Sequence, residues 1–389
     1  MDPYAQATKL QLSHYLILLG SAPISQTTCS SQRYNYYGLA AYGLVPSNAT
    51  DRYGDTLGGF GSAVTFYQSA WNKGQDGSYD GIIWAMPDRG WNTNGTLNYQ
   101  SRIHKFSIHL DPAPNASGSD PSPPNMHLAY IDSIRRYADA IGFISLDGFP
   151  HLPQATYNGD GFGGPGLTNR RVTLDCEGLV VDSDGDFWIP DKYGPYIYRF
   201  SKYGKMLLAI TPPPAFLPLR NGIVSFSGAE PPTFEPDQVP SHPDPTAGRA
   251  NNQGLEGLTI SPDGRFLYVM MQSAMNQEGG PKKKSRRQTR LLEYDISDKK
   301  SPVLMWLHCL FMTMDPKPPG SRKSIGFPMD RARDSGFGRG ADKTESEYRH
   351  FDVISTAEAT NFAHGKWDSV NGSIANTKGL LNPNITAAT

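Results

Sequence analysis

Residues 175–194 read DCEGLVVDSDGDFWIPDKYG, and residues 254–268 repeat the first part of that stretch as GLEGLTISPDGRFLY. In both copies a Glu-Gly-Leu triplet is followed by Asp-Gly, with the aspartate seven positions after the glutamate, and then by an aromatic-rich apolar run. An Asp-Gly dipeptide supplies the positive-φ turn that joins two short antiparallel strands. The repeat therefore predicts two β-hairpins, one after Glu177 and one after Glu256.

A third and looser copy lies earlier in the chain, where residues 80–90 read DGIIWAMPDRG. Its Pro-Asp-Arg at 87–89 matches Pro-Asp-Lys at 190–192, again at the end of an aromatic strand. Recurring four-stranded units with loops on one face are what a β-propeller requires. We therefore expect an all-β fold, a β-propeller built of four-stranded antiparallel blades.

The composition agrees with many short strands, because the 389 residues include 40 Gly, 32 Pro and 20 Tyr. The following segments are predicted to be strands: 63–67, 81–86, 102–110, 196–200, 205–210 and 290–296. The segment at 102–110 alternates cleanly between apolar and polar residues, as a half-buried strand does. The strand at 290–296 is expected to close the sheet of the second repeat. One short helix is expected at 131–140, and the strand pattern degrades beyond Pro302.

Charge is nearly balanced, with 36 Lys and Arg against 37 Asp and Glu, which predicts neither nucleic acid nor an anionic membrane surface as a partner. No run reaches 18 uninterrupted apolar residues, so no transmembrane helix is expected. The three cysteines, Cys29, Cys176 and Cys309, allow at most one internal disulfide.

Residues 1–28 form a signal-like or disordered N-terminal segment with a short apolar run at 15–22. Acceptor sequons for N-glycosylation begin at five positions: Asn48, Asn94, Asn115, Asn371 and Asn384. Together these features predict a secreted, extracellular protein.

Several short motifs have competing interpretations. Gly159, Gly161 and Gly164 satisfy Gly-x-Gly-x-x-Gly, but they do not lie between a strand and a helix, so no nucleotide cofactor is expected. Asp182, Asp184 and Asp186 resemble the start of a calcium loop, yet they lack its glycine and closing glutamate. A tight hairpin turn is the first interpretation of these aspartates, and a surface calcium site is the second.

Charged residues recur at matching strand ends, where equivalent blades would bring them to the central channel or its mouth. The predicted catalytic residues are Asp88, Glu177, Asp191 and Glu256. The predicted substrate-binding residues are Arg89, Lys192 and Arg249. Carboxylates held this close need cations, either the three basic residues or a metal ion with Glu177, Asp191 and Glu256 as candidate ligands. Calcium is the ion considered. The alternative is that Glu177 and Glu256 bind backbone amides and tie blades together.

These motifs resemble the phytase-like family, also described as having esterase-like activity of phytase, and its fungal secreted branch in particular. The matching segments are Pro-Asp-Arg-Gly-Trp-Asn-Thr at 87–93, Glu-Gly-Leu at 177 and 256, Ile-Tyr-Arg-Phe at 197, Ser-Pro-Asp-Gly at 261, Asn-Gln-Glu-Gly-Gly at 276, Leu-Leu-x-Tyr-Asp at 291, Arg-Asp-Ser-Gly at 333 and Thr-Glu-Ser-Glu-Tyr-Arg-His at 344. The resemblance covers roughly residues 29–302 and 332–385.

The resemblance implies a secreted β-propeller that hydrolyses phosphoester or ester bonds through a carboxylate-rich channel. The expected partner is a small phosphorylated or ester substrate, and the expected state is a monomer with neither nucleic acid nor membrane insertion. The alternative is a non-catalytic β-propeller that binds a glycan or a protein through its loops.

The sequence departs from the family pattern at three places. Lys192 stands where the family usually has an acidic residue, which counts against calcium. The expected strands between Pro302 and Arg333 are replaced by unlike sequence, and a closing stretch is expected beyond Thr389. The predicted domains are the propeller at 29–310, an aberrant linker at 311–331 and a partial last blade with a tail at 332–389. An unclosed propeller has unpaired strand edges, so a marginally stable fold is expected.

Overall fold

A computed structural model describes most of the chain. The described residues are 41–57, 59–88, 100–116, 122–137, 174–225, 244–280, 287–311 and 354–388, with short segments at 25–29, 32–36, 154–156 and 170–172 and single positions at 23, 120, 282 and 285. Predictions for the apolar run at 15–22, for Arg89, for the Asn94 sequon, and for residues 312–353 of the linker and last blade lie outside the described residues.

The chain divides into two compact units. One comprises Met1–Leu57, Thr65–Trp84 and His104–Ser133, and the other comprises Gly58–Val64, Ala85–Ile103 and Ile134–Thr389. All the described residues of the predicted site belong to the second unit.

Strands β3 to β7 form a five-stranded sheet in the order β3-β5-β6-β7, with β4 paired to β5. Their bounds are β3 Ala63–Phe66, β4 Asn72–Lys73, β5 Tyr79–Met86, β6 Arg102–Leu110 and β7 Met126–Arg135, with a short 3-10 helix η1 at Gln68–Ala70. A separate two-stranded sheet pairs β1 Ser25–Cys29 with β2 Gln32–Tyr36. The predicted strands at 63–67, 81–86 and 102–110 are confirmed within a few residues.

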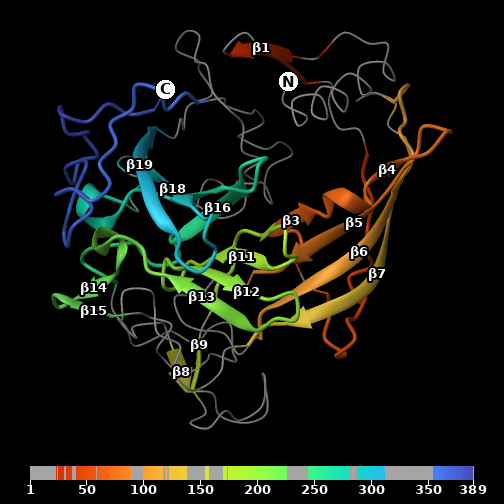
Figure 1. The fold of residues 1–389 in the computed structure, drawn as a ribbon, viewed down its shortest axis with the longest axis horizontal. Coiled ribbons are helices and arrows are strands. Elements are labelled where there is room, and N and C mark those ends of the chain that lie inside the picture. Colours follow the sequence, from red (N-terminus) through yellow and green to blue (C-terminus); the bar gives the residue numbers. More distant parts are fainter. Residues whose placement is uncertain are drawn as a thin grey trace. The chain divides into compact units, whose positions relative to one another are not determined.

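The second unit contains two four-stranded antiparallel sheets, each a meander with its strands in chain order (Figure 1). The first sheet is made of β10 Val180–Val181, β11 Phe187–Pro190, β12 Ile197–Phe200 and β13 Met206–Ile210. The second is made of β16 Leu255–Ile260, β17 Phe266–Met271, β18 Gln288–Asp295 and β19 Val303–Phe311. Smaller elements are β8 Gln154–Thr156, β9 Arg170–Val172, β14 Leu219–Arg220, β15 Ile223–Val224, η2 Pro214–Phe216 and η4 Asn276–Glu278.

Both hairpins predicted from the repeat are confirmed. In the first, Val180 pairs with Trp188 and the turn passes through Gly185 at φ 80°. In the second, Ile260 pairs with Leu267 and the turn passes through Gly264 at φ 72°. The glycine of each Asp-Gly dipeptide therefore adopts the left-handed conformation that a tight turn needs, which fixes the register of both blades.

The core of the second unit lies between its two four-stranded sheets, where β10 and β11 contact β16. Its most deeply buried apolar side chains include Trp188, Ile197, Leu255, Leu267, Leu292 and Leu307. Phe362 and Ile374, from the segment at 354–388, pack into the same cluster. Each such side chain contributes roughly 1.5–3 kcal/mol when it is withdrawn from water, so the C-terminal segment is part of the core.

Two expectations about secondary structure are wrong. Residues 131–135 of the helix predicted at 131–140 belong to β7 instead, because pairing in the sheet prevails over the weak helical texture of this segment. The strand at 290–296 does not close its sheet, because β19 pairs along the whole of β18. Val303, Met305 and Trp306 of β19 are exposed, whereas residues 307–310 are buried, so the strand passes from an exposed half to a half buried on both faces and shows no regular alternation.

The described chain is thus an all-β protein of the β-propeller class. Three sheets of four or more strands are described, whereas closed propellers use about four to eight blades, so these strands make an incomplete set of blades. Among the described residues, no helix has the length and apolar character to cross a bilayer.

Candidate functional site

The two repeats meet at their Glu-Gly-Leu triplets. A Cβ added to Gly178 would lie 2.7 Å from Leu258 Cβ and 2.8 Å from Pro190 Cγ. A Cβ added to Gly254 would lie 2.5 Å from the Cα of Lys192. Such distances are closer than side chains tolerate, so glycine at both positions lets the backbones of neighbouring blades approach one another. The glutamates that adjoin these contacts are therefore held close together.

Lys192 lies between the two repeat-equivalent glutamates. Its Nζ is 2.5 Å from Glu177 Oε1 and 3.9 Å from Glu256 Oε1. The side chains of Lys192 and Glu177 are 2% and 8% exposed, and that of Glu256 is 15% exposed. The structure thus brings together three predicted site residues, with Glu256 the most accessible of them.

Glu177 is held in an environment that favours its protonated form. Burial raises the pKa of Glu177 well above its ordinary value, and nearby Lys192 opposes this shift. The negative charges of Asp175, Glu256 and Asp88 raise the pKa further. Asp88, which follows β5, is therefore close enough to belong to the same electrostatic cluster, as its matching strand-end position predicts.

Asp191 is fully buried and is bound by the backbone. Its Oδ1 accepts a hydrogen bond from the Asp175 N–H at 2.6 Å, and its Oδ2 accepts one from the Gly194 N–H at 3.0 Å. The Lys192 N–H also donates to the Asp175 carbonyl at 3.0 Å. Asp191 thereby fixes the loop that positions Lys192, which is the kind of backbone role considered above for the glutamates.

Arg249 is buried and faces the same loop. Its Nε donates to the Tyr193 carbonyl at 2.8 Å, and its Nη1 donates to the Ala250 carbonyl at 3.2 Å. Burial lowers the pKa of Arg249 to about 10. With these bonds in place, the guanidinium holds the loop at 191–194, and a substrate phosphate would have to compete with backbone carbonyls for it.

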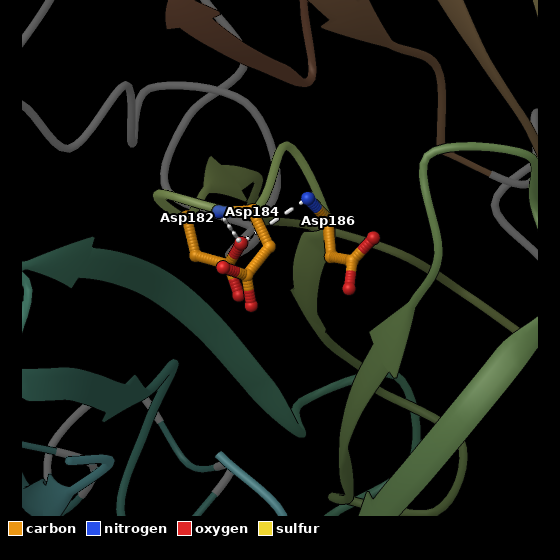
Figure 2. A group of neighbouring side chains, drawn as sticks. All are labelled: Asp182, Asp184 and Asp186. Atoms are coloured by element: carbon orange, nitrogen blue, oxygen red, sulfur yellow. Dashed lines mark hydrogen bonds between the residues drawn. The ribbon is translucent and has the colours of Figure 1, made fainter. Parts of the chain in front are cut away.

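The aspartates at 182, 184 and 186 form a separate group at the β10–β11 turn (Figure 2). The N–H groups of Asp184 and Asp186 donate to Asp182 Oδ1 at 2.9 and 3.2 Å, drawn as dashed lines in Figure 2. In the second repeat the hydroxyl of Ser261 takes the same place, accepting from Arg265 N at 3.1 Å and Phe266 N at 2.8 Å. The arrangement is that of a hairpin turn, the first interpretation given above.

Two cations already offset much of the negative charge of the three aspartates at this turn. Arg199 Nη2 lies 2.8–3.1 Å from a carboxylate oxygen of each of the three aspartates. Lys299 Nζ lies 2.8 Å from Asp184 and 3.4 Å from Asp182. A metal ion at this turn would have to displace both side chains.

Asp175 is a member of the site that the sequence pattern did not reveal. It is buried, it receives the Lys192 N–H on its carbonyl, and it raises the pKa of Glu177. Its equivalent in the second repeat is Gly254, so the repeat itself offered no signal. The only available clue was its position two residues before the glutamate.

The raised pKa values of the buried carboxyl groups Asp191 and Glu177 predict that the protein becomes less stable as the pH rises. Burial raises the pKa of Asp191 from the ordinary 3.8 to about 7. The unfolded chain loses this proton near pH 3.8, whereas the folded chain keeps it to about pH 7. The tighter binding of the proton by the folded chain therefore contributes fully to stability below pH 3.8, and this contribution is lost as the pH rises to about 7. Glu177 acts in the same direction. The loss from Asp191 is about 4 kcal/mol.

Differential scanning fluorimetry from about pH 4 to 8 checks this prediction. We expect the melting temperature of the wild type to fall across this interval, and that of Asp191→Asn to start lower and to depend less on pH. An unchanged slope in Asp191→Asn would assign the titration to other groups.

The fold and the site together define a β-propeller protein with a carboxylate-rich site at the ends of its blade strands. The chain belongs to the phytase-like family, described as having esterase-like activity of phytase: the family's profile matches residues 74–324, more than half of the chain. The resemblance drawn from the motifs is thereby confirmed.

One similar protein comes from Arthroderma benhamiae and bears the name "Uncharacterized secreted protein". It is 48% identical over 391 residues, an alignment that covers 93% of this chain and 76% of the relative. No solved structure matches the chain.

Proposed function

We propose that the chain is a secreted hydrolase of ester or phosphoester bonds whose reaction takes place at the Glu177–Lys192–Glu256 cluster. The observation that carries the proposal is a glutamate with a raised pKa beside an ammonium and a second, more accessible glutamate. Two carboxyl groups with different environments are the usual basis of acid–base catalysis, in which one group holds a proton and the other is ionised.

The proposed roles follow from burial and charge. Glu177 retains a proton and donates it to the leaving oxygen, because burial and neighbouring carboxylates favour its neutral form. Glu256, with the greater exposure, accepts a proton from the attacking water. Lys192 stabilises the negative charge that develops on the substrate, since an ammonium in a dry site acts strongly on such charge. Asp191 and Arg249 hold the loop that positions Lys192.

The charge of the cluster favours an uncharged ester over a phosphate dianion. The charged neighbours that shift the pKa of Glu177 are three carboxyl groups, those of Asp175, Glu256 and Asp88, and one cation, Lys192. A phosphate dianion beside Glu177 would therefore meet more negative than positive charge. A small carboxylic ester is the substrate class that this balance suits better.

Family membership and the relative's name support the hydrolytic class and the location. The family is described by an esterase-like activity, and the Arthroderma benhamiae relative is named as secreted. The apolar run at 15–22 and the exposed sequon asparagines Asn48, Asn115, Asn371 and Asn384 are consistent with export. We propose an extracellular monomer, modified at some of these asparagines.

The test is hydrolysis of p-nitrophenyl acetate, p-nitrophenyl phosphate and phytate by the purified chain. We expect acetate to be the best of the three substrates and Glu177→Gln to lower kcat by about 100-fold or more, the usual cost of losing a general acid. Glu256→Gln is expected to act in the same way. Glu293→Gln, on the partly buried face of β18, is the matched control and should retain activity.

A second candidate function is a non-catalytic binding module for a glycan or a protein. It is favoured by the low exposure of Lys192 and Glu177 and by the backbone bonds of Asp191 and Arg249. Wild-type chain that hydrolyses none of the three substrates, or equal activity in Glu177→Gln, Glu256→Gln and wild type, would favour this alternative.

A further inference from the structure

The ammonium of Lys192 stands at metal-ligand distance from a carboxylate oxygen. Its Nζ lies 2.5 Å from Glu177 Oε1, while calcium binds carboxylate oxygens at roughly 2.3–2.6 Å. A divalent ion bound to this oxygen would come into contact with the ammonium, and both would carry positive charge. At such a distance the repulsion is large in a buried site.

Lys192 has no simple way to vacate this position. Its side chain is 2% exposed, and its backbone packs so closely against Gly254 that a Cβ there would lie 2.5 Å from both its Cα and its carbonyl oxygen. Its N–H donates to the Asp175 carbonyl at 3.0 Å. The cation is therefore part of the folded structure, unlike a mobile surface lysine.

The remaining candidate metal ligands also fit poorly. Asp191, one of the three, accepts backbone N–H groups on both of its carboxylate oxygens. Calcium takes about six to eight oxygen ligands, so a site that loses Asp191 and shares Glu177 with an ammonium is short of donors. The residues present do not suit a calcium ion.

We infer that Lys192 is the resident cation of this site, which takes the place of a divalent metal ion between the two repeat-equivalent glutamates. Glu177 and Glu256 come from matching positions of two blades, and one ammonium bridges them. This inference deepens the proposed function, on whose site it rests, by making that site independent of metal. Replacing the ammonium with a carboxylate is expected to create a divalent-cation site from the same residues.

The experiment is a calcium titration with two readouts, the heat of binding in isothermal titration calorimetry and the melting temperature. All proteins carry Asp184→Asn, which weakens the separate aspartate group at the β10–β11 turn; Asp184 is 56% exposed, so this background change should leave the fold intact. The chain with Lys192 is expected to show no saturable calcium binding. Lys192→Glu is expected to bind calcium and to melt at least several degrees higher with the ion than without it.

A second variant shows which oxygens bind the ion. Lys192→Glu combined with Glu177→Gln is expected to lose most of the calcium binding gained by Lys192→Glu alone. Magnesium serves as the comparison ion, since it demands a tighter octahedral geometry and should bind the gained site more weakly.

Two results would overturn the inference. In the first, the chain that retains Lys192 binds calcium and the substitution Glu177→Gln abolishes this binding. This result does not depend on whether the Lys192→Glu protein folds. The second is a folded Lys192→Glu protein without calcium binding. Neither measurement uses a substrate, so a chain that fails to hydrolyse esters would refute the proposed function and leave this test intact.

Discussion

Replacement of Arg290 by methionine is expected to lower the free energy of unfolding by about 3–5 kcal/mol, the usual cost of removing one partner from a buried ion pair. Arg290 and Glu278 form such a pair, and their side chains are 1% and 0% exposed. Methionine fills a similar volume but leaves the Glu278 carboxylate in the core without its cation. That uncompensated group, more than the lost attraction, accounts for the expected effect.

The pair also anchors the C-terminal segment at 354–388. Glu278 Oε1 accepts the Ile374 N–H at 2.8 Å, and Arg290 Nη1 donates to the Trp367 carbonyl at 3.2 Å. The guanidinium lies 5.3 Å from the ring centroid of Phe216 and 5.6 Å from that of Phe362. Loss of Arg290 should therefore loosen this segment before the sheets unfold.

Urea denaturation and limited proteolysis together check this prediction. We expect Arg290→Met to unfold at lower urea and to be cleaved first within residues 354–388. Arg265→Met is the control, because the Arg265 side chain is 55% exposed and its pair with Asp295 should matter little. Glu278→Gln with Arg290→Met should recover part of the loss, since the buried charge is then absent. Equal effects of Arg290→Met and Arg265→Met would show that the buried pair has no special role.

The hairpins were predictable because their determinants are local. Asp184-Gly185 and Asp263-Gly264 specify a turn within four residues, and alternation specifies strands such as Arg102–Leu110. Residues 131–135 were misassigned because their strand character comes from pairing in a sheet, which no local pattern records. The edge strand β19 was missed because it is exposed near its start and buried on both faces at residues 307–310, so no alternation marks it.

The site was predictable only in part. Repetition identified Glu177 and Glu256 as equivalent, and the structure places one lysine between them. The backbone bonds of Asp191 and Arg249 were not visible in sequence, because their partners are carbonyl and amide groups that any residue carries. Asp175 lacks a repeated counterpart. The pair of Glu278 and Arg290 depends on contacts with a segment far away in sequence: Ile374 lies 96 residues from Glu278, and Trp367 lies 77 residues from Arg290.

Lys192→Met is expected to destabilise the second unit by up to about 3–5 kcal/mol, a loss that is complete only at a pH where Glu177 is ionised and is left buried without its cation. Glu177 would respond by keeping its proton to higher pH, since the only neighbour that lowers its pKa among the named groups is Lys192. With the folded pKa raised further, the loss should be smaller near pH 5, where Glu177 keeps its proton with or without Lys192, and larger near pH 8, because the ammonium stabilises only the ionised carboxylate.

A double-mutant cycle measures this dependence between the two side chains. Lys192→Met combined with Glu177→Gln should be more stable than the sum of the single losses predicts, with a coupling free energy of at least about 1 kcal/mol at pH 8. The same cycle with Glu293→Gln in place of Glu177→Gln should be additive, because Glu293 lies on β18, a different strand from those that adjoin Lys192 and Glu177. Urea midpoints at pH 5 and pH 8 supply all the values. Additive losses for the Lys192–Glu177 pair would mean that the 2.5 Å contact carries no net interaction, and Lys192 would then lose its role in both catalysis and ion replacement.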